Sequence, residues 1–266
     1  MKVRNKVVVV TGGGNGIGRE LCLGLLSKGA SVVAVDIDAS ALEETLARAG
    51  KNRDRLATRI VNITDRSAVD ALPAEVISRF GAVDGIINNA GVIQPFVRVK
   101  DLDYAAIDRV MNVNLFGTLY MIKAFLPHLL ARPEAHITNI SSMGGFLPVP
   151  GQTIYGAAKA SVKLLTEGLN SELQGTNVKV TVVFPGGVHT NIAQNSGVNI
   201  ETKGGEGSAR MLPADKAARI ILEGIENDRY RVLVGPDAML MDALYRLDPQ
   251  RAARFIYKQM VGLLPK

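Results

Sequence analysis

The sequence contains no tryptophan, and aromatic residues make up only 5% of its 266 positions. So few rings make an aromatic base-stacking surface for single-stranded nucleic acid unexpected. There is also no zinc-finger spacing, so we expect no nucleic-acid partner. The one cysteine, Cys22, cannot form an internal disulfide. It lies in an apolar stretch, and we interpret it as a buried thiol in a reducing compartment.

Long hydrophobic runs are missing as well. No apolar run looks long enough to span a bilayer. The short valine run after Lys6 leads directly into a glycine loop, which is unlike a signal peptide. We therefore expect a cytoplasmic protein.

Positive charge is in excess, with a formal net charge of +6 and a pI near 9.5. Part of the excess lies near the end of the chain, where only Asp248 opposes Arg246, Arg251, Arg254, Lys258 and Lys266. The simplest interpretation is a solvated helix face. The alternative is attraction to an anionic substrate, or a weak contact of this basic tail with a membrane surface.

Strand and helix patterns alternate along the whole chain. Short β-branched runs predict strands at residues 7–10, 31–35, 59–63, 83–88, 136–141, 178–184 and 231–234. Between them, apolar residues recur at helical spacing. This order predicts an α/β fold of the Rossmann type, a doubly wound parallel sheet of about seven strands with helices on both faces. We expect one domain over 1–266, ending in a helical tail over 238–266.

Several local signals set the expected helix boundaries. Ser40 and Glu43 have capping-box spacing, Pro73 predicts a kink or break within 65–80, and Pro127 predicts the end of a long helix that begins at Asp103. The tail should break near Pro249. The segment 191–210, rich in Gly, Asn and Ser, is interpreted as a mobile loop.

A glycine-rich loop at 11–18 joins the first expected strand to the first expected helix. Gly12, Gly16 and Gly18 would let backbone N–H groups and the helix N-terminus approach a pyrophosphate. A purely structural turn is the alternative. Asp36 ends the second strand, where a carboxylate can accept hydrogen bonds from ribose hydroxyls and would repel a 2′-phosphate. Ile37 follows it, so the sequence favours NAD over NADP.

Tyr155 and Lys159 are four residues apart on an expected helix and share one face. A tyrosine is too weakly acidic to act as a base at neutral pH, with a reference pKa near 10. A nearby ammonium lowers the pKa of a phenol, so this pair could exchange a proton with an alcohol or carbonyl oxygen. The spacing by itself is common.

With these residues, the chain resembles the short-chain dehydrogenase/reductase family. The matching pieces are 11–18, 88–91, Asn114, Ser142, the stretch 155–159, and Pro185 and Gly186 with Thr190. The resemblance implies an acid/base role for Tyr155, a ribose contact and a lowered Tyr155 pKa through Lys159, a substrate hydrogen bond from Ser142, and a water relay through Asn114. It also implies cofactor contacts from Gly12, Asn15, Gly16, Ile17, Gly18, Asp36, Ile37, Asn62, Ile63, Asn89, Ala90, Gly91, Tyr155, Lys159, Pro185, Gly186, Val188 and Thr190. Asn62 departs from the family, which often has Asp there.

The resemblance implies an NAD-dependent oxidoreductase that exchanges hydride with a secondary alcohol or ketone, needs no metal, and forms a homodimer or homotetramer. Small and apolar residues predict a hydrophobic substrate, such as a steroid, a fatty hydroxyacyl group or a terpenoid. These pocket residues would be Met143, Gly144, Gly145, Phe146, Gln152, Gly187, Val188 and 191–210. Two alternatives stay open, a lyase or epimerase on the same scaffold and a nucleotide-binding protein without catalysis.

Overall fold

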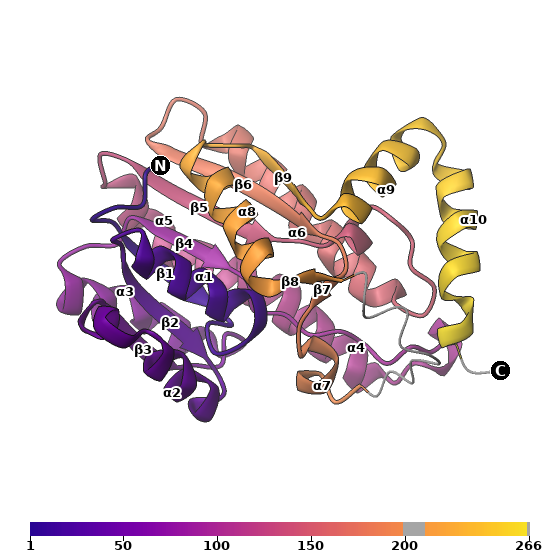
Figure 1. Ribbon diagram of the computed structural model, residues 1–266, viewed down its shortest axis with the longest axis horizontal. Helices are drawn as coiled ribbons and strands as arrows, with labels where there is room; N and C mark the ends of the chain where they lie inside the picture. The colour runs from indigo at the N-terminus through magenta and orange to yellow at the C-terminus, as the bar shows by residue number, and fades with distance from the viewer. Residues whose placement is uncertain (199–210, 265–266) are drawn as a thin grey trace.

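A seven-stranded sheet forms the centre of the computed structural model, which describes residues 1–198 and 211–264 (Figure 1). The strand order is β3-β2-β1-β4-β5-β6-β9, and every neighbouring pair is parallel. The strands are β1 Val7–Thr11, β2 Ser31–Asp36, β3 Leu56–Ile60, β4 Gly85–Asn88, β5 Ala135–Ile140, β6 Val178–Pro185 and β9 Arg231–Val234. The predicted doubly wound parallel sheet is confirmed. A small second sheet pairs β7 (Val188–His189) with β8 (Leu212–Pro213).

Helices cover both faces of this sheet because the strands are apolar on both sides. Val8 and Val10 point into a core with α1 (Gly16–Ser27), α2 (Ala39–Arg48) and α8 (Ala214–Glu226). Val7 and Val9 point into the opposite core. There they meet α3 (Arg66–Phe80), α5 (Thr118–Leu130) and α6 (Thr153–Glu172). The unbroken valine run is therefore the signature of a strand that is buried on both faces.

The third strand begins earlier than the sequence suggests. It covers Leu56–Ile60 rather than 59–63, because Leu56 pairs with Val32 and packs into the core, directly after the 3-10 helix η1 (Gly50–Arg55). Residues after Ile60 leave the sheet, and the Asn62 side chain accepts hydrogen bonds from the backbone and hydroxyl of Thr64. The predicted capping box is also wrong, since Asp38 caps α2 by accepting from the Ala41 N–H.

Neither internal proline ends its helix. Pro73 lies inside an unbroken α3, whose cap is Asp65, and Pro127 lies inside α5, which continues to Leu130. Both helices continue because burial of neighbouring side chains, Leu72 and Val76 in α3 and Phe125 and Leu129 in α5, offsets one lost backbone hydrogen bond.

The long helix that contains Pro127 is made of three parts. These are α4 (Tyr104–Met111), the π-helical segment η3 (Asn112–Gly117) and α5. By length and composition this stretch, Tyr104–Leu130, could cross a membrane, so the expectation that no run is long enough is wrong on that criterion. In the fold its own residues Met121, Phe125 and Leu129 are buried in the core beside α3 and the sheet, as in a core helix.

The chain continues beyond β9 into two helices that project at one end of the molecule (Figure 1). These are α9 (Pro236–Leu247) and α10 (Pro249–Met260), followed by η6 (Val261–Leu263), and they meet near Pro249 as expected. Met241, Ala252 and Ile256 form a separate small core with Leu147. The last helices are therefore attached to the loop that follows β5.

Candidate active site

The glycine loop after β1 is shaped for close backbone approach. Gly12 and Gly16 have φ angles of +65° and +50°, which favour glycine. A Cβ on Gly18 would lie 1.9 Å from the Gly12 carbonyl oxygen. Asn15 caps α1 by accepting from the Gly16 N–H at 2.7 Å. The positive end of the α1 dipole therefore lies at the cavity, where it attracts an anionic group.

A buried arginine braces this loop from behind. Arg19 donates from Nε to the Gly14 carbonyl at 2.9 Å and from Nη1 to Glu44 at 2.7 Å. Thr45 donates to the Gly13 carbonyl at 3.0 Å. Because Glu44 neutralises its charge, Arg19 is engaged within the fold rather than directed at a ligand. The sequence analysis missed this brace, and no spacing signal marks it.

Asp36 lies at the carboxyl end of β2, in the wall of the same cavity. Its Oδ2 accepts from the Gly14 N–H at 2.9 Å, and its Oδ1 accepts from the Asp38 N–H at 3.2 Å. These bonds hold the carboxylate beside the loop. Each carboxylate oxygen has further lone pairs, so Asp36 can still accept hydrogen bonds from a ligand.

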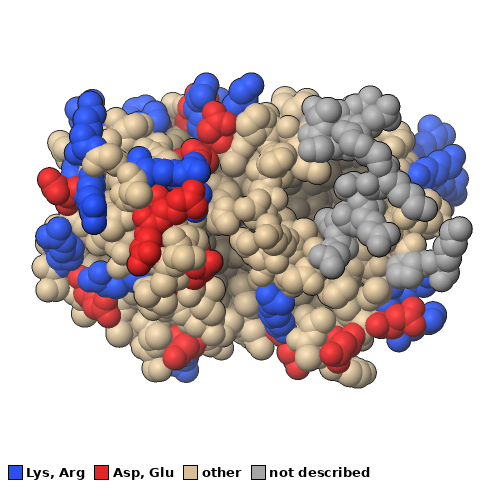
Figure 2. Space-filling view, turned by 60° about the horizontal axis from the view of Figure 1, so that its bottom comes forward, with Lys and Arg blue, Asp and Glu red and all other residues tan. Residues whose placement is uncertain are grey.

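The cavity has a volume of about 550 Å³ and lies where the carboxyl ends of the strands meet. Figure 2 shows one face of the molecule that is hollowed near its centre, with mostly uncharged residues among the described ones around the hollow. The predicted site residues that line it are Gly12, Asn15, Gly16, Ile17, Asp36, Ile37, Asn62, Ile63, Asn89, Gly91, Ser142, Tyr155, Lys159, Pro185, Gly186, Val188 and Thr190. Gly18, Ala90 and Asn114 do not line it. They lie behind its walls.

The wall formed after β4 is held by side-chain hydrogen bonds. Asn89 donates from Nδ2 to the Thr11 carbonyl at 3.0 Å, and Thr11 in turn accepts the Asn89 and Ala90 N–H groups through its hydroxyl. A Cβ on Gly91 would lie 2.7 Å from Asn114 Oδ1 and 3.2 Å from Lys159 Nζ. Only glycine fits between them, so Gly91 lets the backbone pass next to the amine.

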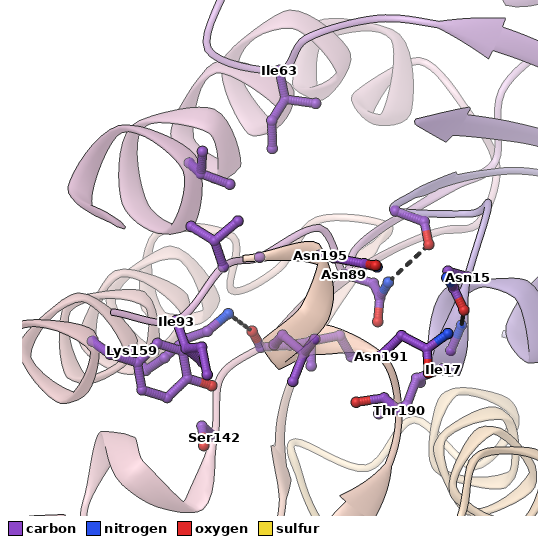
Figure 3. Close-up of a pocket in the computed structure, with 18 of the residues that line it drawn as sticks. Asn15, Ile17, Ile63, Asn89, Ile93, Ser142, Lys159, Thr190, Asn191 and Asn195 are labelled. Carbon is purple, nitrogen blue, oxygen red and sulfur yellow. Dashed lines mark hydrogen bonds between the residues drawn. The ribbon is translucent and has the colours of Figure 1, made fainter. Parts of the chain in front are cut away.

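Ser142 and Lys159 lie at one end of the cavity, while Asn15, Ile17 and Thr190 lie at the other (Figure 3). Tyr155 belongs to the first end, because its side chain is hydrogen-bonded with Ser142. Lys159 is 4% exposed and donates from Nζ to the Ile140 carbonyl at 2.9 Å. Its Nζ is 5.9 Å from the centroid of the Tyr155 ring. Burial lowers the pKa of Lys159 to about 8.

The phenol behaves differently from the sequence-based expectation. Burial raises the pKa of Tyr155, and a hydrogen bond with Ser142 opposes this only in part. The expected lowering of the Tyr155 pKa is therefore not found. The phenol keeps its proton at neutral pH, so it is a proton donor.

Asn114 lies within the π-helical segment η3 and is fully buried. Its side chain accepts from the Val92 N–H at 3.1 Å and donates to the Val92 carbonyl at 2.8 Å. Thr118 donates its hydroxyl to the Asn114 carbonyl at 2.9 Å. Asn114 thus ties the long helix to the wall after β4, next to Lys159.

The segment after β6 closes the remaining side. The Gly187 N–H donates to Asp237 Oδ2 at 2.6 Å, which joins this segment to the start of α9. Further on, α7 (Ile192–Asn195) reaches the opposite wall, where Ser196 accepts the Ile93 N–H at 3.0 Å and its carbonyl accepts from Arg109 at 2.9 Å. Residues 199–210 of the predicted mobile loop lie outside the described residues.

Among the described residues expected to form a substrate pocket, most do not line this cavity. Phe146 stacks edge-on with Phe184, with ring centroids 5.5 Å apart, and Gln152 is buried against the Gln94 backbone. Gly144 lies close to the catalytic side chains, since a Cβ added to it would be 3.5 Å from both Ser142 Oγ and the Tyr155 ring. Of that predicted set, Val188 and residues 191, 192 and 195 line the cavity.

Comparisons with known proteins agree with this geometry. The family model for short chain dehydrogenases matches residues 6–200. A Mycobacterium tuberculosis protein named as the oxidoreductase SadH is 36% identical over 268 residues, which covers 98% of this chain and 97% of that protein.

Two solved structures have the same fold. One is a short-chain dehydrogenase/reductase from Burkholderia phymatum in complex with NAD, with a TM-score of 0.84, 28% identity, and coverage of 94% of this chain and 96% of that one. The other is a short-chain dehydrogenase from Burkholderia cenocepacia in complex with NADP, with a TM-score of 0.80, 26% identity, and coverage of 96% and 99%. The chain therefore belongs to the short-chain dehydrogenase/reductase family and is an oxidoreductase of that type.

Proposed function

We propose that this oxidoreductase transfers hydride between NAD(H) and a secondary alcohol or ketone with a hydrophobic body. The observation that carries the proposal is that Ser142, Tyr155 and Lys159 share one cavity with the glycine loop and Asp36. A nucleotide-binding end and a proton-transfer end thus lie within one continuous space.

The residues present fit a dinucleotide. Gly12 and Gly16 leave space for a pyrophosphate at the α1 N-terminus, and Asp36 offers acceptors for ribose hydroxyls. Asp36 would repel a 2′-phosphate, and the nearby Arg19 is bonded to Glu44 rather than free to attract one. These two features support NAD over NADP. Relatives bind either nucleotide, so the preference rests on Asp36.

Bound in this cavity, the nicotinamide would accept or deliver the hydride. Tyr155 would donate its phenolic proton to a ketone oxygen, or take the proton of an alcohol once ionised. Ser142, already hydrogen-bonded with Tyr155, would steady the same oxygen. Lys159 would stabilise the phenolate from the next helical turn and bind the adjacent ribose. Asn114 would position a water beside Lys159 as part of the proton relay.

The substrate end of the cavity supports a hydrophobic substrate. Ile93 lies at the end of the cavity that holds Lys159 and Ser142 (Figure 3), and Val92, Val188 and Ile192 also line the cavity. Few charged groups face this region, so a steroid, fatty hydroxyacyl group or terpenoid would lose less by desolvation than a polyol would. Efficient turnover of short polyols without turnover of lipophilic alcohols would refute this substrate class.

A screen of NAD and NADP with secondary alcohols, and of NADH and NADPH with ketones, tests the reaction by following reduced-nicotinamide absorbance. The Tyr155→Phe variant should bind NADH as wild type does and lose turnover by about 10²–10⁴-fold. If Tyr155→Phe kept full turnover, or if no redox change accompanied conversion of the substrate, the lyase or epimerase alternative would replace the proposal.

Assembly and cellular setting are further parts of the proposal. We propose a cytoplasmic homodimer or homotetramer that pairs through α4, α5 and α6. This is supported by exposed apolar side chains on those helices, with Tyr104 81% and Leu164 68% exposed. Leu164→Glu should reduce the oligomer mass measured by light scattering. The control is Leu240→Glu, at an exposed position on α9, which should leave that mass unchanged.

The basic tail is proposed to make a weak contact with an anionic membrane surface. Arg254 and Lys258 share the exposed face of α10 with Phe255, and within residues 1–198 and 211–264 neither cation forms an ion pair. Sedimentation with phosphatidylglycerol vesicles, but not phosphatidylcholine vesicles, is expected, and Arg254→Glu with Lys258→Glu should abolish it. If the wild type and the double variant sedimented equally with phosphatidylglycerol vesicles, the proposed contact would be excluded.

A further inference from the structure

Gln94, a glutamine outside every motif named above, is hydrogen-bonded to the backbone at Tyr155, the proposed acid/base residue. Gln94 follows the wall residues after β4 and is fully buried, with 0% exposure. A buried amide is costly unless its donor and acceptor are both bonded. Here both ends of the Gln94 side chain have partners, and all of them lie at the start of α6.

The start of α6 lacks a cap from its own sequence. Its N-cap residue, Gln152, makes no side-chain capping bond. The first N–H groups of a helix have no partner inside the helix. Gln94 Oε1 accepts two of them, from Ile154 at 2.8 Å and from Tyr155 at 2.9 Å. A residue about 60 positions earlier thus replaces the local cap.

Two more hydrogen bonds fix this arrangement. Gln94 donates from Nε2 to the Gly151 carbonyl at 3.0 Å, and the Gln94 carbonyl accepts from Gln152 Nε2 at 2.7 Å. The two glutamines therefore hold the turn before α6 from both sides. An aliphatic side chain in place of Gln94 would leave the Tyr155 and Ile154 N–H groups and the Gly151 carbonyl without these partners.

Gln94 directly follows two residues that line the cavity, Val92 and Ile93. Its neighbour Ile93 lines the cavity at the end where Ser142 and Lys159 lie (Figure 3). The Ile93 N–H donates to Ser196, and Val92 is bonded to Asn114 on both its N–H and its carbonyl. The short segment 92–94 is thus hydrogen-bonded to Asn114, to Ser196 and to the backbone of Tyr155.

We propose that Gln94 is a positioning residue: by capping α6 at Tyr155, it sets the distance between the phenol and the cofactor wall. This rests on the proposed acid/base role of Tyr155. Small displacements of a reacting group are costly, since about 1 Å can lower a rate by about 10²-fold. Loss of the cap should therefore lower kcat, while NADH binding at the distant glycine loop stays the same.

Three variants test the proposal, assayed with acetophenone and NADH as a lipophilic ketone probe or, if this ketone is not turned over, with the best ketone of the screen. Gln94→Leu removes the cap and should lower kcat by about 10–100-fold, with the NADH Kd within about twofold of wild type. Gln94→Glu keeps the Oε1 acceptor for the Ile154 and Tyr155 N–H groups but loses the Nε2 donor to the Gly151 carbonyl, so it should restore part of kcat. Gln94→Asn keeps the amide on a side chain shorter by one methylene, which draws the acceptor away from both N–H groups and should lower kcat.

A matched control separates positioning from general stability. Asn177 is partly buried and donates its side-chain amide to the carbonyls of Leu129 and Arg132, at the opposite end of the sheet. Asn177→Leu should lower Tm comparably to Gln94→Leu and leave kcat unchanged. Should Gln94→Leu not fold, a lower kcat of Gln94→Asn at an unchanged NADH Kd decides.

The outcomes distinguish the two proposals. Wild-type kcat in folded Gln94→Leu or in Gln94→Asn overturns the role of Gln94 while Tyr155→Phe is still inactive. An active Tyr155→Phe overturns the proposed function itself.

Discussion

Replacing Lys159 with methionine should stabilise the folded protein at neutral pH while removing activity. Lys159 is buried, and burial lowers the pKa of its amine from 10.5 to about 8. Keeping a proton on this amine in the fold therefore costs about 3 kcal/mol relative to the unfolded chain. Methionine has a similar length and no charge, so it removes this cost.

The loss of one hydrogen bond opposes that gain. The Ile140 carbonyl would lose its partner, which costs about 1–2 kcal/mol. The net expectation is a variant about 1–2 kcal/mol more stable at pH 7, or a Tm higher by about 3–6 °C. Scanning calorimetry of the protein without cofactor measures this difference.

The pH dependence gives the sharper test. Below about pH 8 the Lys159 amine is charged in both the folded and unfolded states, so the cost is fully present. Between pH 8 and 10.5 the folded protein releases the proton first, and the wild type gains stability as the pH rises. The advantage of Lys159→Met should therefore disappear by about pH 10.

Lys163→Met is the matched control on the same helix. Lys163 is partly exposed and pairs with Glu167 at 2.8 Å, so its replacement should produce no such pH-dependent gain. The reasoning would be refuted if Lys159→Met were less stable than wild type at pH 7. It would also be refuted if the difference in Tm between variant and wild type were the same at pH 7 and pH 10.

Two further predictions concern the nucleotide end. Gly18→Ala places a Cβ 1.9 Å from the Gly12 carbonyl, so it should cost about 2–3 kcal/mol or more in unfolding free energy and abolish NADH binding. The same change at Gly168, where nothing lies within 4 Å, should instead stabilise α6 by about 0.5–1 kcal/mol. Asp36→Asn keeps an acceptor for the Gly14 N–H but removes the charge, and the NADP-to-NAD affinity ratio measured by fluorescence titration should rise about tenfold. An unchanged ratio would remove the argument for NAD.

The parallel sheet was predictable because valines such as Val7 to Val10 are buried on both faces, which leaves a clear apolar run. The start of β3 was not, because Leu56 follows charged residues of η1 and only pairing with β2 includes it in the sheet. Pro127 shows a similar limit. Its local cost is visible in the sequence, whereas the burial of Phe125 and Leu129 that offsets it depends on the tertiary fold.

The cavity-lining residues were largely predictable because their motifs lie at strand ends, where parallel strands bring them together. The supports behind them were not. Arg19 contacts Glu44 on another helix, and Gln94 caps a helix about 60 positions later, so neither pairing has a local spacing. The raised pKa of Tyr155 was also missed, because burial is a property of the fold and its effect opposes that of neighbouring groups.

The hydrogen bond from Gly187 to Asp237 has a consequence for synthesis on the ribosome. The groups that hydrogen-bond to the glycine loop come early in the chain, since Arg19, Asp36 and Asn89 all precede β5. The segment after β6 must wait until about fifty more residues have been translated before its anchor, Asp237, exists. Nascent chains halted before Asp237 would therefore carry the hydrogen-bonded glycine loop together with a segment after β6 that lacks its anchor.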